Sequence, residues 1–157
     1  MKIINLFVLS IWINCMALSA QIVTPVQANY QLSKNPVKKG DEITLIFTLN
    51  IDNNWHVYSN IQNYQLGPLP TSFEFEPHNS YKLLGDVQPI GSKKEYEPVF
   101  EVEVNYFEKI AEFRQKIKVC LENPTVKGYY EYQVCNDLDG MCIMQTEDFE
   151  FKIQTIK

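Results

Sequence analysis

Hydrophobic and polar residues alternate with a period of two over most of the chain beyond residue 40. The alternating segments are 43–51, 100–106, 111–119 and 149–153. Such alternation is typical of β-strands that bury one face and expose the other. The hydrophobic pattern therefore predicts a protein built mainly from half-buried strands.

Turn-forming residues separate the alternating segments. The clusters are Asn35-Pro36, Asp52-Asn53-Asn54, Gly67-Pro68-Leu69-Pro70 and Asn123-Pro124. About eight short strands with such turns, and no amphipathic helix between them, predict an all-β, immunoglobulin-like antiparallel β-sandwich. The stretch from Tyr81 to Pro98 has the least regular pattern, and we expect a long loop there.

The N-terminus has the pattern of an export signal. Met1-Lys2 gives a positive start, and the apolar run Ile3 to Leu18 contains a few polar residues and is too short for a typical membrane span. We expect a signal peptide over residues 1–20, cleaved near Ala20. The remainder, residues 21–157, has the length of a single domain.

Composition argues against several classes of function. The chain has 19 acidic and 14 basic residues and a net charge of -5, which does not favour binding to nucleic acid or an anionic membrane. It has no Gly-rich phosphate loop, no Ser nucleophile elbow and only two histidines. We therefore expect neither a hydrolase nor a bound cofactor or metal.

Cys135 and Cys142 are the strongest candidates for chemistry. They flank a short turn between two alternating segments, so they could form a disulfide in an oxidising compartment. Closing so short a loop stabilises a fold by about 2.5 kcal/mol, against about 4.7 kcal/mol for a loop of 100 residues. A short bridge on an exposed hairpin is also easily reached by a thiolate of another protein, which favours a redox role.

Two alternatives to the redox hypothesis stay open. The bridge could be a structural staple in a non-catalytic secreted binding module. Alternatively, Met141 and Met144 could join the two cysteines as soft ligands for Cu(I). The remaining cysteine of the mature chain, Cys120, is expected to stay reduced and buried as a small hydrophobic residue.

The charges near the pair in the sequence are all negative. The acidic residues Asp137, Asp139, Glu147 and Asp148 lie close to the pair, and no Lys, Arg or His does. This local field is expected to oppose thiolate formation. His56 lies far away in the sequence, and on pattern alone a lone strand histidine is more often structural than functional.

Several motifs resemble one known family. Tyr132-Gln133-Val134-Cys135 followed by Gly140-Met141-Cys142 resembles the N-terminal periplasmic domain of the DsbD thiol:disulfide interchange protein. The strand Trp55-His56-Val57-Tyr58 and the turn Gly67-Pro68-Leu69-Pro70-Thr71 are similar to that family as well, and the order of elements matches from about Val26 to Ile153.

The resemblance implies an immunoglobulin-like electron carrier in the periplasm that acts as a component of a thiol:disulfide oxidoreductase. Cys142 would form the mixed disulfide with a partner and Cys135 would resolve it. Tyr58 and His56 would flank the pair, and the segment Glu95-Tyr96-Glu97 would form a cap with Tyr96 as its lid.

The resemblance also implies the partners. The electron donor would be a membrane-embedded DsbD-like protein or a separate thioredoxin-like domain, since residues 1–157 contain no Cys-x-x-Cys motif. The acceptors would be periplasmic thioredoxin-fold proteins such as disulfide isomerases and the thioredoxins of cytochrome c maturation, and the carrier itself would be a monomer. The chain departs from the family in a longer intercysteine loop and in Ile143-Met144, where members usually have two prolines.

Overall fold

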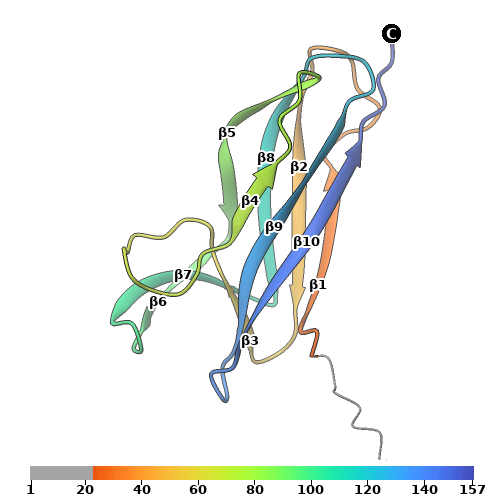
Figure 1. Ribbon diagram of the computed structural model, residues 1–157. Coiled ribbons are helices and arrows are strands. Elements are labelled where there is room, and N and C mark those ends of the chain that lie inside the picture. Colours follow the sequence, from red (N-terminus) through yellow and green to blue (C-terminus); the bar gives the residue numbers. More distant parts are fainter. Residues whose placement is uncertain (1–22) are drawn as a thin grey trace, which may run out of the picture.

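The computed structural model describes residues 23–157, which form ten β-strands in two facing sheets (Figure 1). In chain order the strands are β1 (Val26–Leu32), β2 (Glu42–Ile51), β3 (Trp55–Tyr58), β4 (Ser72–Phe75), β5 (Tyr81–Ile90), β6 (Lys93–Glu97), β7 (Val102–Glu108), β8 (Ile110–Val119), β9 (Thr125–Asn136) and β10 (Cys142–Lys152). The predicted signal peptide lies outside the described residues.

The two sheets have different sizes and both are antiparallel. Strands β1, β2, β8 and β5 form the first sheet in that spatial order, and the second sheet has the order β10, β9, β3, β7 and β6, with β4 added along β9. No helix occurs in residues 23–157, so none there could span a membrane. The predicted all-β sandwich is confirmed.

The alternating segments form the core between the sheets. Every second residue of β2 and β8 is buried, as the period of two requires. Phe47 lies at the centre, where its ring contacts five aromatic rings at centroid distances of 5.0 to 6.3 Å: Phe73, Phe75, Tyr130, Phe149 and Phe151. Each such side chain contributes about 1.5–3 kcal/mol through burial.

The prediction of a long loop from Tyr81 to Pro98 is wrong. This stretch contains β5 and β6. In β5 the register shifts between Leu84 and Gln88, and Gly85 has a positive φ of 70°, so the hydrophobic period is interrupted. Strand β6 is exposed along most of its length and therefore has no hydrophobic alternation to detect.

The hairpin of β6 and β7 projects from one side of the sandwich near its lower end (Figure 1). It is joined to the rest of its sheet through β3, which pairs with β7 on one side and with β9 on the other. The four-residue strand β3 therefore connects the projecting hairpin to the hairpin of β9 and β10, where the two cysteines lie.

Candidate functional site

Cys135 and Cys142 form a disulfide, as the sequence predicted. They are directly opposite each other in the β9–β10 ladder, with their Cα atoms 4.1 Å apart and their sulfurs 2.06 Å apart. Cys135 is only 3% exposed, whereas Cys142, the first residue of β10, is exposed. The two sulfurs of one bridge thus differ in access to solvent.

The intercysteine loop is held by hydrogen bonds within itself and to the neighbouring turn. The amide of Asn136 donates to the carbonyl of Met141 at 2.8 Å, and the amide of Gly140 donates to the carbonyl of Asn136 at 3.0 Å. The amide of Asp137 donates to the carbonyl of Asn54 at 2.8 Å. These bonds fix the backbone of Asp137 against the β2–β3 turn, even though the loop is longer than the family resemblance implies.

A row of aligned residues crosses the sheet at the level of the bridge. Cys142 is paired with Cys135, Cys135 with His56 of β3, and His56 with Glu108 of β7. Directly opposed residues in an antiparallel ladder project from the same face of the sheet. The neighbouring residues Val57 and Val134 belong to the sandwich core, so this row projects from the outer face.

His56 is bonded to an acidic residue of the intercysteine loop. Its Nδ1 lies 2.6 Å from Oδ1 of Asp137, and its side chain is 16% exposed against 44% for Asp137. The expectation that no Lys, Arg or His lies near the pair therefore holds only along the sequence. The fold places an imidazole on the strand next to Cys135, because β3 pairs with β9 at this point.

A cavity of about 620 Å³ lies beside the bridge, and we call it the disulfide cavity. Both cysteines line it together with all four predicted flanking residues, namely His56, Tyr58, Glu95 and Tyr96. Tyr96 lies on its wall with 60% of the residue exposed. The sequence-predicted site residues are therefore brought together in one place.

The protein is matched over residues 19–153 by the family model described as "Thiol:disulfide interchange protein DsbD, N-terminal". The chain belongs to this family.

Two solved structures show the same fold at low sequence identity. The reduced DsbD N-terminal domain of Neisseria meningitidis has a TM-score of 0.53 and 15% identity, covering 85% of this chain and 90% of that one. The N-terminal periplasmic domain of ScsB from Proteus mirabilis has a TM-score of 0.52 and 10% identity, covering 83% of this chain and 49% of that one. No curated protein sequence matches the chain.

Tyr58 connects the bridge to the β6–β7 hairpin. Its hydroxyl donates a hydrogen bond to Oε2 of Glu97 at 3.3 Å, and its ring packs with Val104 and Cys135 in a small buried cluster separate from the main core. Burial raises the pKa of Tyr58 above its usual value, and the nearby Glu97 carboxylate raises it further. Tyr58 is therefore a neutral donor at ordinary pH.

Strand β7 lines the disulfide cavity with the acidic residue Glu108 and with Tyr106. Glu108 accepts a hydrogen bond from Nζ of Lys93 at 2.6 Å, which lowers the pKa of that carboxyl, and a second from Tyr106 at 3.3 Å. Burial, with Glu95 nearby, raises the pKa of the Tyr106 hydroxyl. The Glu108 carboxylate therefore accepts hydrogen bonds from Lys93 and Tyr106, whereas the Asp137 carboxylate bonds to His56.

Sequence reasoning assigned no site role to seven residues that line the disulfide cavity. They are Pro98, Val99, Phe100, Val104, Tyr106, Glu108 and Asn136. The alternation over 100–106 predicts a strand with its apolar face in the core, but Val104 packs against Tyr58 and Cys135 on the outer face instead. The residue that identifies the core-facing side of β7 is Phe107, which belongs to the main core and lies on the opposite face from Val104.

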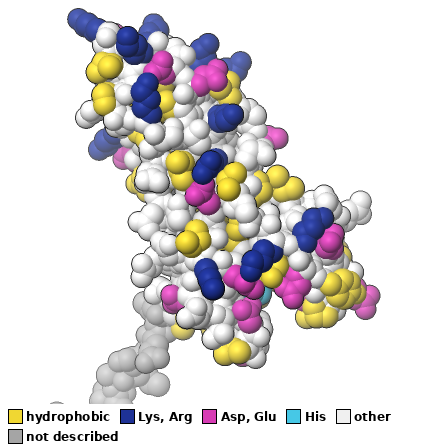
Figure 2. Space-filling view, turned by 180° about the vertical axis from the view of Figure 1, so that it is seen from behind, with side chains coloured by type: hydrophobic (Ala, Val, Ile, Leu, Met, Phe, Trp, Pro, Cys, Tyr) yellow, Lys and Arg dark blue, Asp and Glu magenta, His cyan; other side chains and the backbone are white. Residues whose placement is uncertain are grey.

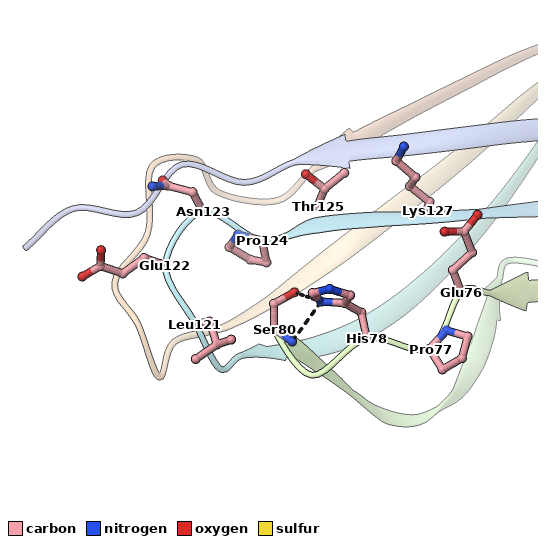
Figure 3. Close-up of a pocket in the computed structure, with 10 residues that line it drawn as sticks. All are labelled: Glu76, Pro77, His78, Ser80, Leu121, Glu122, Asn123, Pro124, Thr125 and Lys127. Carbon is pink, nitrogen blue, oxygen red and sulfur yellow. Dashed lines mark hydrogen bonds between the residues drawn. The ribbon is translucent and has the colours of Figure 1, made fainter.

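A second cavity of about 440 Å³ lies among the β4–β5 and β8–β9 loops, and we call it the distal cavity (Figure 3). Here Nδ1 of His78 lies 2.6 Å from the hydroxyl oxygen of Ser80 and accepts from its amide at 3.2 Å. Both contacts are to a residue only two positions away, so they stabilise a short turn and engage Nδ1 of His78 within it.

Cys120 follows β8 and is close to this distal end. Among residues 23–157 it is the one cysteine outside the disulfide, as predicted. It is half-buried rather than fully buried, because it lies just beyond the end of β8, where its amide donates to the carbonyl of Ser80. The expectation of a fully buried Cys120 is therefore corrected.

Proposed function

We propose that this protein carries electrons in the periplasm by exchanging the Cys135–Cys142 disulfide with thiols of partner proteins. The observation that carries the proposal is the unequal exposure of the two sulfurs, with Cys142 open to solvent and Cys135 buried. A partner thiolate can reach Cys142 and form a mixed disulfide with it, and Cys135 then resolves that bond.

The sheet order supports attack at Cys142. Exchange requires the attacking, central and leaving sulfurs to lie nearly in line, so the attacker must approach Cys142 from the side opposite to Cys135. Strand β10 is the edge of its sheet, and no strand of residues 23–157 pairs with it on that side. Attack on Cys135 would have to come from the β3 side, where His56 stands in the ladder.

The β6–β7 hairpin is the proposed cap of the site. Tyr96 and Glu95 come from β6, and Phe100 and Val99 from its turn into β7, and all four line the disulfide cavity. The hydrogen bond between Tyr58 and Glu97 ties the hairpin to β3. Docking of a partner would displace this cap, so that small oxidants reach the bridge less readily than a fitting protein does.

The proposed partners follow from the family. Electrons would come from a membrane-embedded DsbD-like donor or a separate thioredoxin-like domain, and pass to periplasmic thioredoxin-fold proteins, including those of cytochrome c maturation. The carboxylates of Glu95, Glu97 and Asp137 around the cavity favour partners with basic residues beside their reactive cysteines. Figure 2 shows acidic, basic and hydrophobic side chains on the projecting hairpin, and Lys and Arg are most frequent at the upper end.

Measurement of the reduction potential tests the proposal. Structural bridges have potentials below about -300 mV, whereas exchange-active ones are less reducing, and we expect the second outcome for Cys135–Cys142. A Cys135→Ser variant should trap partners as mixed disulfides through Cys142, while a Cys142→Ser variant should trap few. A potential in the structural range would favour the binding-module alternative.

A further inference from the structure

One imidazole side chain, that of His56, lines the disulfide cavity. His56 stands opposite Cys135 in the ladder and lines the same cavity as both sulfurs. Directly opposed residues in an antiparallel pair have Cα atoms roughly 4.5–5.5 Å apart, so their side chains on one face are neighbours. Imidazole is the side chain whose proton exchange falls in the neutral range.

The contact with Asp137 fixes which nitrogen is available. An ionised carboxylate only accepts hydrogen bonds, so Nδ1 of His56 must carry a proton in the 2.6 Å contact. The other nitrogen, Nε2, then holds the lone pair of the neutral ring and the second proton of the charged ring. The amide of Asp137 is itself held by Asn54, so the carboxylate is anchored on a fixed loop.

We propose that His56 is the proton relay of this exchange site and that Asp137 is its positioning residue. The proposal rests on the proposed function and adds to it the fate of the proton. Attack on exposed Cys142 expels Cys135 as a thiolate on a strand between β10 and β3, with His56 as its neighbour on the side away from Cys142. The leaving sulfur therefore forms next to the imidazole.

A partner thiolate attacks Sγ of Cys142, a new sulfur–sulfur bond forms, and the Cys135–Cys142 bond breaks with both bonding electrons passing to Sγ of Cys135. Protonated His56 gives its Nε2 proton to that thiolate. In the reverse direction neutral His56 takes the proton from the Cys135 thiol, whose thiolate attacks Cys142 and releases the partner as a thiolate.

The relay matters because Cys135 is otherwise surrounded by groups that disfavour a buried thiolate. Cys135 is 3% exposed and packs against Tyr58 and Val104. Burial without a cationic partner raises the free energy of a thiolate, which makes it a poorer leaving group. A proton from His56 removes this charge as it forms.

Other ionisable groups face His56 from every strand packed around it. Glu108 and Tyr106 come from β7, Tyr58 lies two residues along β3, Asp137 follows β9, and Glu95, Tyr96 and Glu97 come from β6. Lys93 is bonded to Glu108. None of the other groups combines the position opposite Cys135 with an imidazole nitrogen left free by its partner.

The first experiment measures the rate at which dithiothreitol reduces the oxidised protein between about pH 5 and pH 9, expressed per dithiothreitol thiolate. In the parent protein this rate constant should rise as the pH falls, because more His56 is protonated. His56→Gln should remove the rise and be about tenfold slower near pH 6, while the rates at high pH agree. Glutamine keeps a polar side chain of similar length that can donate a hydrogen bond, but it cannot take up or release a proton in this pH range.

Two further variants make the comparison specific. His78→Gln removes the other histidine, at the distal end of the sandwich, and should leave the pH profile of the parent unchanged. Asp137→Asn should shift the rise to lower pH, because the charged ring loses its carboxylate partner. Asp137 lies in a half-exposed loop, so this variant also provides a test if His56→Gln folds poorly.

A spectroscopic readout needs no substitution at the site. With only two histidines in the chain, the ring signals of His56 and His78 can be assigned with the His78→Gln variant and followed by NMR in the oxidised and reduced protein. The titration of His56 should shift between the two states, whereas that of His78 should not.

Two results would overturn the relay. One is that the reduction rates of the parent and of His56→Gln depend on pH in the same way, and the other is that the NMR titration of His56 is the same in the oxidised and reduced protein. The failure of the proposed function has a different signature. In that case the bridge has the potential of a structural disulfide in every variant, whatever the pH profile of its reduction.

Discussion

Each end of the sandwich contains a histidine and a cysteine, but the two ends are built differently. At the lower end His56 bonds to Asp137 and lies opposite Cys135, beside a cavity of about 620 Å³. At the distal end His78 bonds to Ser80 two residues away, beside a cavity of about 440 Å³. Cys120 follows a strand there, and no second cysteine of residues 23–157 is bonded to it.

The comparison shows that residue type alone does not make a site. The lower end joins side chains from five strands of one sheet, so an imidazole, a carboxylate and a bridge meet although they lie far apart in sequence. The polar contacts of His78 are local and close a turn. We therefore expect thiol chemistry at the lower end and structural roles at the distal end.

The largest expected difference concerns the cysteines themselves. Cys142→Ser should abolish disulfide exchange with a thioredoxin-fold partner, because the exposed sulfur that receives the attack is lost. Cys120→Ser should retain the full rate, since Cys120 follows β8 at the other end of the sandwich. Rates measured by quenching and mass analysis of the bridge would test this, and equal loss in both variants would remove the distinction between the ends.

The next effect is on stability. The double variant Cys135→Ser, Cys142→Ser should lose about 2.5 kcal/mol of unfolding free energy, because so short a loop restrains little of the unfolded chain. The main core around Phe47 does not include the bridge, so cooperative unfolding should persist. Denaturant unfolding measures both quantities, and a loss of the cooperative transition would give the pair a structural role.

A smaller effect is expected from the proposed cap. Tyr96→Ala should speed alkylation of reduced Cys142 by iodoacetamide severalfold, because the ring no longer hinders approach through the disulfide cavity. Tyr129→Ala removes an exposed tyrosine of β9 that does not line the cavity and serves as the matched control. Equal rates in Tyr96→Ala, Tyr129→Ala and the parent would exclude Tyr96 as a lid.

The smallest effect should come from the distal end. Ser80→Ala removes the hydroxyl that bonds to His78 and should cost about 1 kcal/mol of unfolding free energy, the usual contribution of one hydrogen bond. The exchange rate at Cys142 should not change. Thermal unfolding and the exchange assay on the same protein separate these outcomes, and a slower exchange would show that the two ends are coupled.

The hydrophobic pattern was sufficient to predict the sandwich, and the positions of the two cysteines were sufficient to predict the bridge. Strands β2 and β8 alternate strictly because each has one face in the core, and Cys135 and Cys142 flank a turn that places them opposite each other. The pattern failed for β5, where Gly85 and a register shift interrupt the period, and for β6, which has almost no buried face. A register shift or a solvent-exposed strand therefore leaves a weak hydrophobic signal.

The site was only partly predictable for a related reason. The position of Asp137 beside the pair is visible in the sequence, but its bond to His56 depends on the pairing of β3 with β9. Sequence distance gives no measure of such a contact, because the β3–β9 ladder brings His56 beside Asp137, 81 positions away. Charges near a cysteine in sequence therefore describe only part of its electrostatic environment.

The small cluster of Tyr58, Val104 and Cys135 packs apart from the main core, and this separation has an evolutionary consequence. Substitutions in β6 and in its turn into β7 would alter the wall of the disulfide cavity without disturbing the packing around Phe47. Under the proposed function, variation in this one segment would change the choice of exchange partner while the sandwich stays the same.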